Sequence, residues 1–168
     1  DLLAGIFIIA ENQVRIGDVV EIEGASGTVE HITLRSTVIR DNNGDVHYLA
    51  NGNIIHIVNK TMGFSRVRFV IAVDPKTDID KLAEVINKVG KKLANDDKWK
   101  TKIIEAPHFI NLGEFSNTAL EVSIGGQTKA GDQWAVTSEM KKRLLKEFQD
   151  HNEISLSQYQ NLSTLNNK

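Results

Sequence analysis

The stretch that decides the fold lies near the front of the chain. Residues 16–40 read IGDVVEIEGASGTVEHITLRSTVIR, and they are followed by DNNGD at residues 41–45 and by VHYLANG at residues 46–52. Short β-branched runs are separated there, at close intervals, by Gly, Asn and Asp. This pattern predicts a small β-domain with short strands and tight turns.

Five strands are expected in this domain, over residues 19–23, 28–34, 37–40, 46–49 and 54–58. Asn43-Gly44 is the strongest hairpin signal, because a type I′ turn needs a positive φ at both of its central residues. Within residues 28–34, alternation places Ile32 and Leu34 on one face of the strand. Strands that are this short and this close together favour a small barrel or sandwich.

The pattern changes beyond residue 62, where longer elements are expected. Residues 66–73 alternate as a strand, and Asp78 is placed to cap the helix that follows. The later elements are this helix from Ile79 to Leu93, strand runs at 102–106 and 108–115 separated by Pro107, a strand at 118–124 loosened by Gly125-Gly126, a helix at 132–150 and a last strand at 153–156. The order β-α-β-β-α-β is the ferredoxin-like split motif. Residues 159–168 carry no periodicity and are expected to form a disordered tail.

The composition excludes several kinds of chemistry. The chain has 168 residues, a formal net charge of −2 and no Cys. Disulfides, thiolate catalysis and Cys-ligated zinc are therefore excluded, and no overall field attracts nucleic acid or an anionic membrane. Leu2–Ala10 is an apolar run of nine residues, shorter than the ~20 residues that span a bilayer. It is either a buried terminal strand or helix, or the end of a membrane helix.

No constellation of residues points to catalysis or to a cofactor. The five His residues contain no pair at the i,i+4 spacing of a helical metal site. His31, His47 and His56 could approach one another across strands, but the wet face of a sheet is the commoner place for such residues. The Gly24–Gly27 segment lacks the Lys and the following helix of a phosphate-binding loop. We therefore expect no catalytic residue, no metal, no cofactor and no enzymatic activity.

The order and spacing of several motifs resemble the small-conductance mechanosensitive channel (MscS-type) family, over about residues 1–158. These motifs are Ala4-Gly5-Ile6-Phe7-Ile8-Ile9, Ile16-Gly17-Asp18-Val19-Val20, Gly24-x-x-Gly27-Thr28-Val29, Leu34-Arg35-x-Thr37-x-Ile39-Arg40, Asn51-Gly52-x-Ile54 and Asp132-x-Trp134. The chain departs from the family at Ala50, where the family usually has Pro, and at Ile154–Gln158, where two family prolines are missing.

The resemblance implies a domain order. Residues 1–12 would end a pore-lining transmembrane helix, residues 13–62 would form an Sm-like β-domain, and residues 63–158 would form the ferredoxin-like α/β domain. The fold class is then β followed by α/β. The residues of the pore-helix end would be Ala4, Gly5, Ile6, Phe7 and Ile8.

The resemblance also implies a function and partners. The full-length protein would be a homo-oligomer, a heptamer, in the inner membrane, anchored in the lipid bilayer by N-terminal helices. Its cytoplasmic portion would include these residues. The channel would release ions and small solutes when membrane tension rises in hypo-osmotic shock. No nucleic acid would bind.

Within the β-domain, two sets of residues follow from the resemblance. The turn positions would be Gly17, Asp18, Gly24, Gly27, Gly44, Asn51 and Gly52. The candidates for the core or for a ring interface are Val19, Ile22, Val29, Ile32, Leu34, Arg35 and Arg40. A ring would cover the strand edges of a domain that buries little core alone. The alternative is an Sm-like oligomeric module that binds RNA or protein, although an RNA-binding face would be more basic than this chain.

Overall fold

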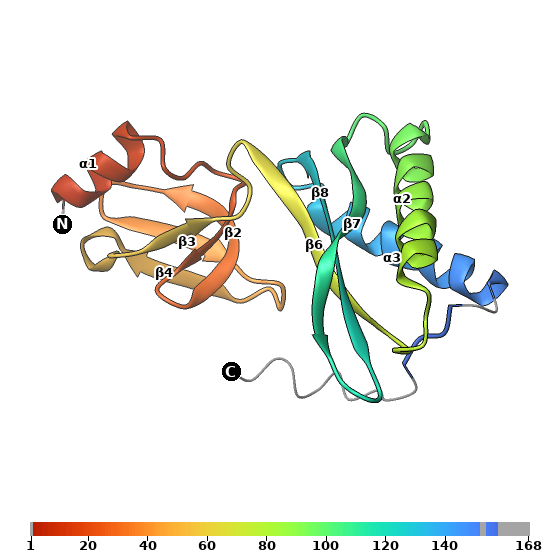
Figure 1. Cartoon of the computed structure of the whole chain (residues 1–168). Coiled ribbons are helices and arrows are strands. Elements are labelled where there is room, and N and C mark those ends of the chain that lie inside the picture. The colour runs from red at the N-terminus through yellow and green to blue at the C-terminus, as the bar shows by residue number, and fades with distance from the viewer. Residues whose placement is uncertain (1, 152–153, 158–168) are drawn as a thin grey trace. The chain divides into compact units, whose positions relative to one another are not determined.

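The computed structural model describes residues 2–151 and 154–157, and the chain divides into two compact units (Figure 1). The boundary between the units lies between Ser65 and Arg66. The first unit holds one α-helix and a five-stranded sheet, and the second holds a three-stranded sheet and two helices. The expected tail at residues 159–168 and the start of the expected last strand, residue 153, lie outside the described residues.

The first unit is an apolar helix followed by short strands. Its elements are α1 (Leu2–Ala10), β1 (Val19–Ile22), β2 (Ala25–Ile32), β3 (Ser36–Arg40), β4 (Val46–Ala50), the 3₁₀ turn η1 (Asn51–Asn53) and β5 (Ile57–Asn59). The sheet order is β4-β3-β2-β1-β5, so β4 and β5 form its two edges. β5 returns to pair with β1 in antiparallel register, with Ile57 opposite Ile22. The five-stranded β-domain expected from the sequence is confirmed.

A small core closes this unit. Its buried members are Ile8, Val14, Val20, Ile22, Val29 and Ile39. Val20 and Ile22 alternate with exposed Glu21 along β1, as the two-residue period of a strand requires. Because Ile8 belongs to α1, the apolar helix is part of the same core as the strands.

The turn with a positive φ at two successive residues lies elsewhere than predicted. Positive φ at two successive residues occurs at Glu23 (48°) and Gly24 (81°), between β1 and β2. In the Asn43-Gly44 hairpin only Gly44 has a positive φ, and the Asp41 carboxylate closes the loop by accepting the Asn43 and Asp45 amides. The Asn-Gly pair therefore predicted the hairpin correctly but not its turn type. The loop is longer than a two-residue turn, and hydrogen bonds to the Asp41 side chain stabilise it.

Two further predictions in this unit were wrong. Gly27 lies inside β2 and not in a turn, and a Cβ atom there would come within 2.3 Å of the Arg40 carbonyl oxygen. Glycine at this position serves close backbone approach. β2 ends at Ile32 after a register shift near Val29, so Leu34 does not share the buried face of Ile32 and is 48% exposed.

The second unit has the predicted ferredoxin-like order. Its elements are β6 (Phe64–Val73), α2 (Ile79–Asn95), β7 (Ile103–Phe115), β8 (Leu120–Lys129) and α3 (Gln133–Asp150). The sheet order is β6-β8-β7, and an isolated bridge pairs Val73 with Leu156. This bridge places the last described segment beside β6, where the fourth strand of the motif belongs.

The helix α2 forms as its sequence predicts. The Asp78 side chain accepts the Asp80 and Lys81 amides at the N-terminus, and Asp96 caps the other end. The buried face of α2 consists of Leu82, Ile86, Val89, Gly90 and Leu93. This face and the buried face of α3 share one core with inward side chains of the sheet, so both helices cover the same side of it.

The strand predictions that rested on glycine and proline were wrong in this unit. β7 runs unbroken through Pro107, although its register shifts between Glu105 and His108. Gly125 and Gly126 lie inside β8. A Cβ atom on Gly126 would come within 2.8 Å of the Glu105 carbonyl oxygen, so this glycine permits close strand approach and does not loosen the chain.

Candidate functional site

The most constrained geometry of the first unit lies where α1 meets the β-domain. A Cβ atom on Gly5 would come within 1.9 Å of the Leu34 carbonyl oxygen, in the loop between β2 and β3. Any other residue would force the two backbones apart. Ile8, on the same face of α1, is 7% exposed and packs in the core. Among the residues of α1 whose side chains the structure describes, Gly5 and Ile8 lie against the β-domain.

The Asn51 side chain lies next to this contact. Its side chain is fully buried and accepts a hydrogen bond from Thr37 Oγ1 at 2.8 Å, while its Nδ2 donates to the Thr33 carbonyl at 2.8 Å. The Asn51 amide donates to the Arg35 carbonyl. Asn51 therefore fixes the β2–β3 loop at the point where Gly5 touches it. The sequence placed Asn51 in a turn but gave no signal that its side chain is buried.

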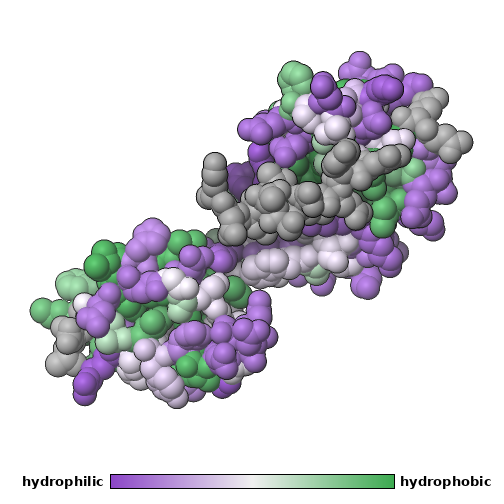
Figure 2. Space-filling model, turned by 90° about the horizontal axis from the view of Figure 1, so that it is seen from below, coloured by the Kyte–Doolittle hydropathy of each residue, from purple (hydrophilic) through white to green (hydrophobic). Residues whose placement is uncertain are grey.

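The other face of α1 is apolar and exposed. Leu3, Ile6, Phe7 and Ile9 are all exposed, and α1 contains no charged residue. Figure 2 shows hydrophobic residues reaching the surface of the first unit in several places. Contiguous apolar surface of this kind marks contact with a protein or a membrane. Among the described helices, none is both long and apolar enough to span a bilayer.

The residues expected at the pore-helix end, Ala4, Gly5, Ile6, Phe7 and Ile8, all fall within α1. They do not share one environment. Gly5 and Ile8 face the β-domain, whereas Ile6 and Phe7 are exposed. A single apolar helix therefore presents two different surfaces.

Most of the expected turn residues lie in turns. Gly17, Gly24 and Gly44 have positive φ, and Gly52 lies in η1. Asp18 ties two segments together, because one carboxylate oxygen accepts the Arg15 amide at 2.9 Å and the Asn59 side chain at 2.7 Å.

The set proposed for the core or an interface separates into two groups. Ile22 and Val29 are fully buried within the unit, Ile32 packs against their core, and Val19 is half-buried. Leu34, Arg35 and Arg40 are exposed. Arg40 pairs with Glu30 and lowers the pKa of that carboxyl. Leu34 and Arg35 belong to the loop that Gly5 touches.

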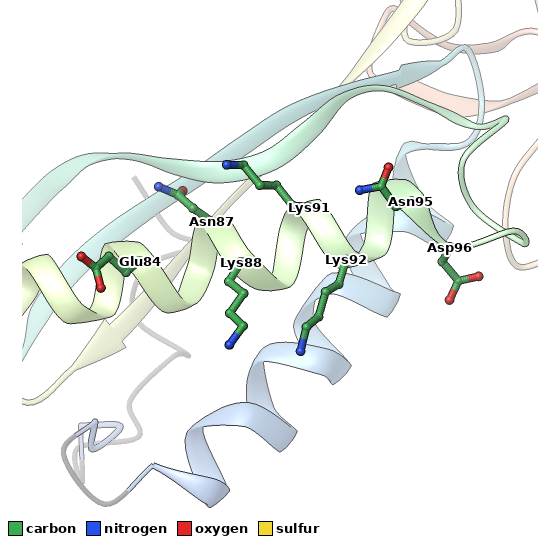
Figure 3. A pocket seen from close by; sticks show the side chains of 7 residues that line it. All are labelled: Glu84, Asn87, Lys88, Lys91, Lys92, Asn95 and Asp96. Carbon is green, nitrogen blue, oxygen red and sulfur yellow. The ribbon is translucent and has the colours of Figure 1, made fainter.

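A hollow on the second unit lacks the features of a chemical site. Its lining residues are Glu84, Asn87, Lys88, Lys91, Lys92, Asn95 and Asp96. All come from α2 and its C-terminal cap, and Lys88 and Lys92 point away from Asn87 and Lys91 (Figure 3). Their polar groups do not converge on one point. Within the described part of the chain, no three His, Asp or Glu side chains are placed to hold a metal ion.

Comparison with known proteins agrees with this geometry. Residues 1–62 match the family model described as the β-domain of the mechanosensitive ion channel. The chain is 32% identical over 152 residues to a small-conductance mechanosensitive channel from Caldanaerobacter subterraneus subsp. tengcongensis, covering 90% of this chain and 53% of that protein. It is 29% identical to the moderate conductance mechanosensitive channel YbiO of Escherichia coli, covering 88% of this chain and 20% of YbiO.

Solved structures extend the likeness to the fold. The crystal structure of Helicobacter pylori MscS in its closed state is similar with a TM-score of 0.72 and 25% identity, covering 92% of this chain and 60% of that one. This chain spans about half the length of the Caldanaerobacter channel. None of these similar proteins is an RNA-binding module, so the comparisons do not support that alternative.

Proposed function

Because the chain belongs to the MscS-type family of mechanosensitive channels, and not to an enzyme family, we propose that it is the portion of such a channel that joins the end of the pore helix to the cytoplasmic domains. The full-length protein would lie in the inner membrane. It would release ions and small solutes when membrane tension rises in hypo-osmotic shock.

The observation that carries this proposal is the double surface of α1. Gly5 and Ile8 attach the helix to the β-domain, while Leu3 and Phe7 remain uncovered. An apolar helix with one face fastened to a soluble domain suits a pore helix that leaves the bilayer and meets that domain. A movement of such a helix would reach the β-domain through the Gly5 contact with the β2–β3 loop.

We propose a ring of copies, a heptamer, as the assembly. The sheet of the first unit has two open edges, β4 and β5, at opposite ends of its strand order. Two different edges can pair head to tail with neighbouring copies, and a rotation that closes makes a ring. Such pairing removes exposed edges that would otherwise invite aggregation. Leu34 and Arg35, both exposed, are the proposed interface members nearest to α1.

The test is electrical and physiological. The full-length protein is expressed in cells that lack their own mechanosensitive channels, and patch recordings are made under suction. We expect pressure-activated current and survival of osmotic downshock. The same protein present in the membrane without current, and without any gain in survival, would overturn the proposal.

A matched pair of variants links the result to α1. Gly5→Val places a side chain against the Leu34 carbonyl and should shift the pressure threshold. Ile9→Val, on the exposed face of the same helix, should leave the threshold unchanged.

A further inference from the structure

Glu23 adopts a backbone conformation that its side chain does not favour. Its φ is 48°, in the left-handed region, and it precedes Gly24 in the tight turn between β1 and β2. Glycine, Asn or Asp occupies such positions at lower cost than a glutamate. A strained non-glycine residue persists where its surroundings compensate for the strain, and it points to a specific role.

The Glu23 carboxylate supplies that compensation. Its Oε1 accepts the Ile55 amide at 2.8 Å and the His56 amide at 3.1 Å. These two residues lie between η1 and β5, thirty-two and thirty-three positions along the chain. These backbone hydrogen bonds, and to a smaller extent the charge of His56, lower the pKa of Glu23.

These two hydrogen bonds extend the pairing of β1 with β5 through a side chain in place of the backbone. The ladder ends at Ile22 opposite Ile57, so its next position would place Glu23 opposite His56. The turn has already carried the Glu23 backbone toward β2. Its side chain therefore takes the place of a backbone acceptor for the residues that lead into β5.

Ile55 is held in an unusual position by these bonds. Its side chain is 92% exposed, and it lies two residues before β5, an edge strand of the sheet. An isoleucine presented in this way gains hydrophobic free energy only when another surface covers it. The fixed amide and the exposed side chain belong to the same residue.

We infer that Glu23 is a positioning residue, which fixes the approach to β5 so that the β5 edge and the Ile55 side chain contact a second copy of this chain. This inference rests on the ring in the proposed function. It adds the residue that sets the geometry of one ring edge. β5 is three residues long, so its position depends strongly on what holds its ends.

The charged groups around Glu23 are few. His56 faces the carboxylate from the segment that leads into β5. Glu21, two residues earlier on β1, pairs with Lys60 at 3.2 Å, just after β5. A change at Glu21 therefore provides a matched control, because it alters a carboxylate between the same two strands without touching the Ile55 amide.

The first experiment measures hydrogen exchange in the full-length protein, at peptides covering residues 53–57, as a function of pH and corrected for intrinsic rates. In the wild type, protection should fall as pH drops through the lowered pKa of Glu23. Glu23→Gly, which relieves the strain but removes the acceptor, should exchange about tenfold faster at neutral pH. Glu23→Gln should lose the pH step, and Glu21→Gln should keep it. Wild-type protection in Glu23→Gly would overturn the inference.

The second experiment measures assembly by native mass spectrometry during gradual denaturation. Glu23→Gly and Ile55→Ser should each make the oligomer dissociate earlier than the wild type. Wild-type stability of the oligomer in both single variants would overturn the contact with a second copy. A wild-type protein that forms no oligomer would contradict the proposed ring itself, while the exchange result would still decide whether Glu23 holds the loop.

Discussion

The two units bury their apolar side chains to different extents. The second unit closes one core between three strands and two helices, with residues such as Leu82, Ile124 and Met140 fully buried. The first unit has a much smaller core, and it leaves large apolar residues exposed, among them Phe7 and Ile55. Both units expose some large apolar side chains, among them Phe115 in the second unit, but the first has fewer buried ones and a sheet whose two edges, β4 and β5, are open.

This difference indicates which unit depends on its surroundings. A domain of some sixty residues buries a smaller share of its surface than a larger one and is marginal alone. The second unit also has an amphipathic helix with an N-cap and a continuous core. We therefore expect the second unit to remain folded in a separated chain, and the first to need neighbouring copies or a bilayer for full stability.

The largest effect should come from matched truncations in the two cores. Ile124→Ala and Ile39→Ala each remove a fully buried side chain. Such a change costs about 2–5 kcal/mol. In the second unit we expect a lower unfolding free energy with a single transition still present. In the first unit the same loss should abolish the folded state of the separated chain.

Fluorescence and hydrogen exchange distinguish these outcomes. Trp99 and Trp134, the two Trp residues of the chain, both lie in the second unit, so urea unfolding followed by tryptophan emission reports that unit. Hydrogen exchange of β2 and β3 reports the first. Equal losses of unfolding free energy in the two units would show that the first unit does not depend more than the second on its surroundings.

A smaller effect is expected at Gly90, which sits where α2 crosses β7. A Cβ atom there would come within 1.7 Å of the Pro107 carbonyl oxygen. Glycine to alanine normally stabilises a helix interior, but here we expect Gly90→Ala to lower the unfolding free energy of the second unit by about 2 kcal/mol through overpacking. Lys91→Ala, at the next and exposed position, is the control for urea unfolding. A stabilised Gly90→Ala protein would show that α2 can move away from β7 freely.

The sequence predicted both units because their strongest signals were local. The alternation in β6, the Asp78 cap and the apolar spacing in α2 each depend on a few neighbouring residues. The glycines were harder. A glycine in a turn and a glycine under a neighbouring backbone look alike in sequence, so Gly27 and Gly126 were assigned to irregular chain although both lie in strands.

The candidate site was predicted only in part, for a related reason. The apolar run of α1 was visible, but which of its residues touch the β-domain depends on the β2–β3 loop. The burial of Asn51 depends on Thr33 and Thr37, which lie on that loop and on β3. Glu23 gave no local signal at all, because its partners lie more than thirty residues away.

The N-cap of α2 should contribute about as much as such caps do elsewhere. Asp78→Ala leaves the Asp80 and Lys81 amides without their acceptor. We expect the unfolding free energy of the second unit to fall by about 1 kcal/mol, measured by thermal or urea unfolding. Asp78→Asn, which retains an acceptor oxygen, should recover most of it. No loss in Asp78→Ala would mean that the start of α2 is not stabilised by its cap.

Ala50 allows a gain in the first unit. Its φ is −69°, close to the value that proline imposes. The Asn51 amide points to β3, so the amide of its neighbour points away, toward the open edge of β4. We expect Ala50→Pro to stabilise the first unit by about 0.5 kcal/mol, seen as slower hydrogen exchange in β3. An oligomer that dissociates earlier in this variant would instead indicate that the amide of residue 50 is used across the ring.

The smallest effect should be the pH response of the β3–β4 hairpin. His47 Nε2 lies 3.0 Å from Asp41 Oδ2, and this hydrogen bond, with the Asp45 and Asn43 amides, lowers the pKa of Asp41. A lowered pKa stabilises the hairpin above the pKa of the unfolded chain, and this stability is lost as pH falls through the folded pKa. Asp41→Asn should flatten the pH profile of amide exchange at Asn43 and Asp45. A profile unchanged by this substitution would show that the Asp41 carboxylate does not cause the pH response.

The contact at Gly5 also limits how this gene can change over generations. Every other amino acid adds a carbon within 1.9 Å of the Leu34 carbonyl oxygen, so no amino-acid replacement at this position is neutral for the fold. At Gly17, where the added carbon meets nothing within 4 Å, only the backbone angle resists change. A residue that tolerates a positive φ, such as asparagine, can therefore replace Gly17. A replacement of Gly5 requires a second change that moves the β2–β3 loop.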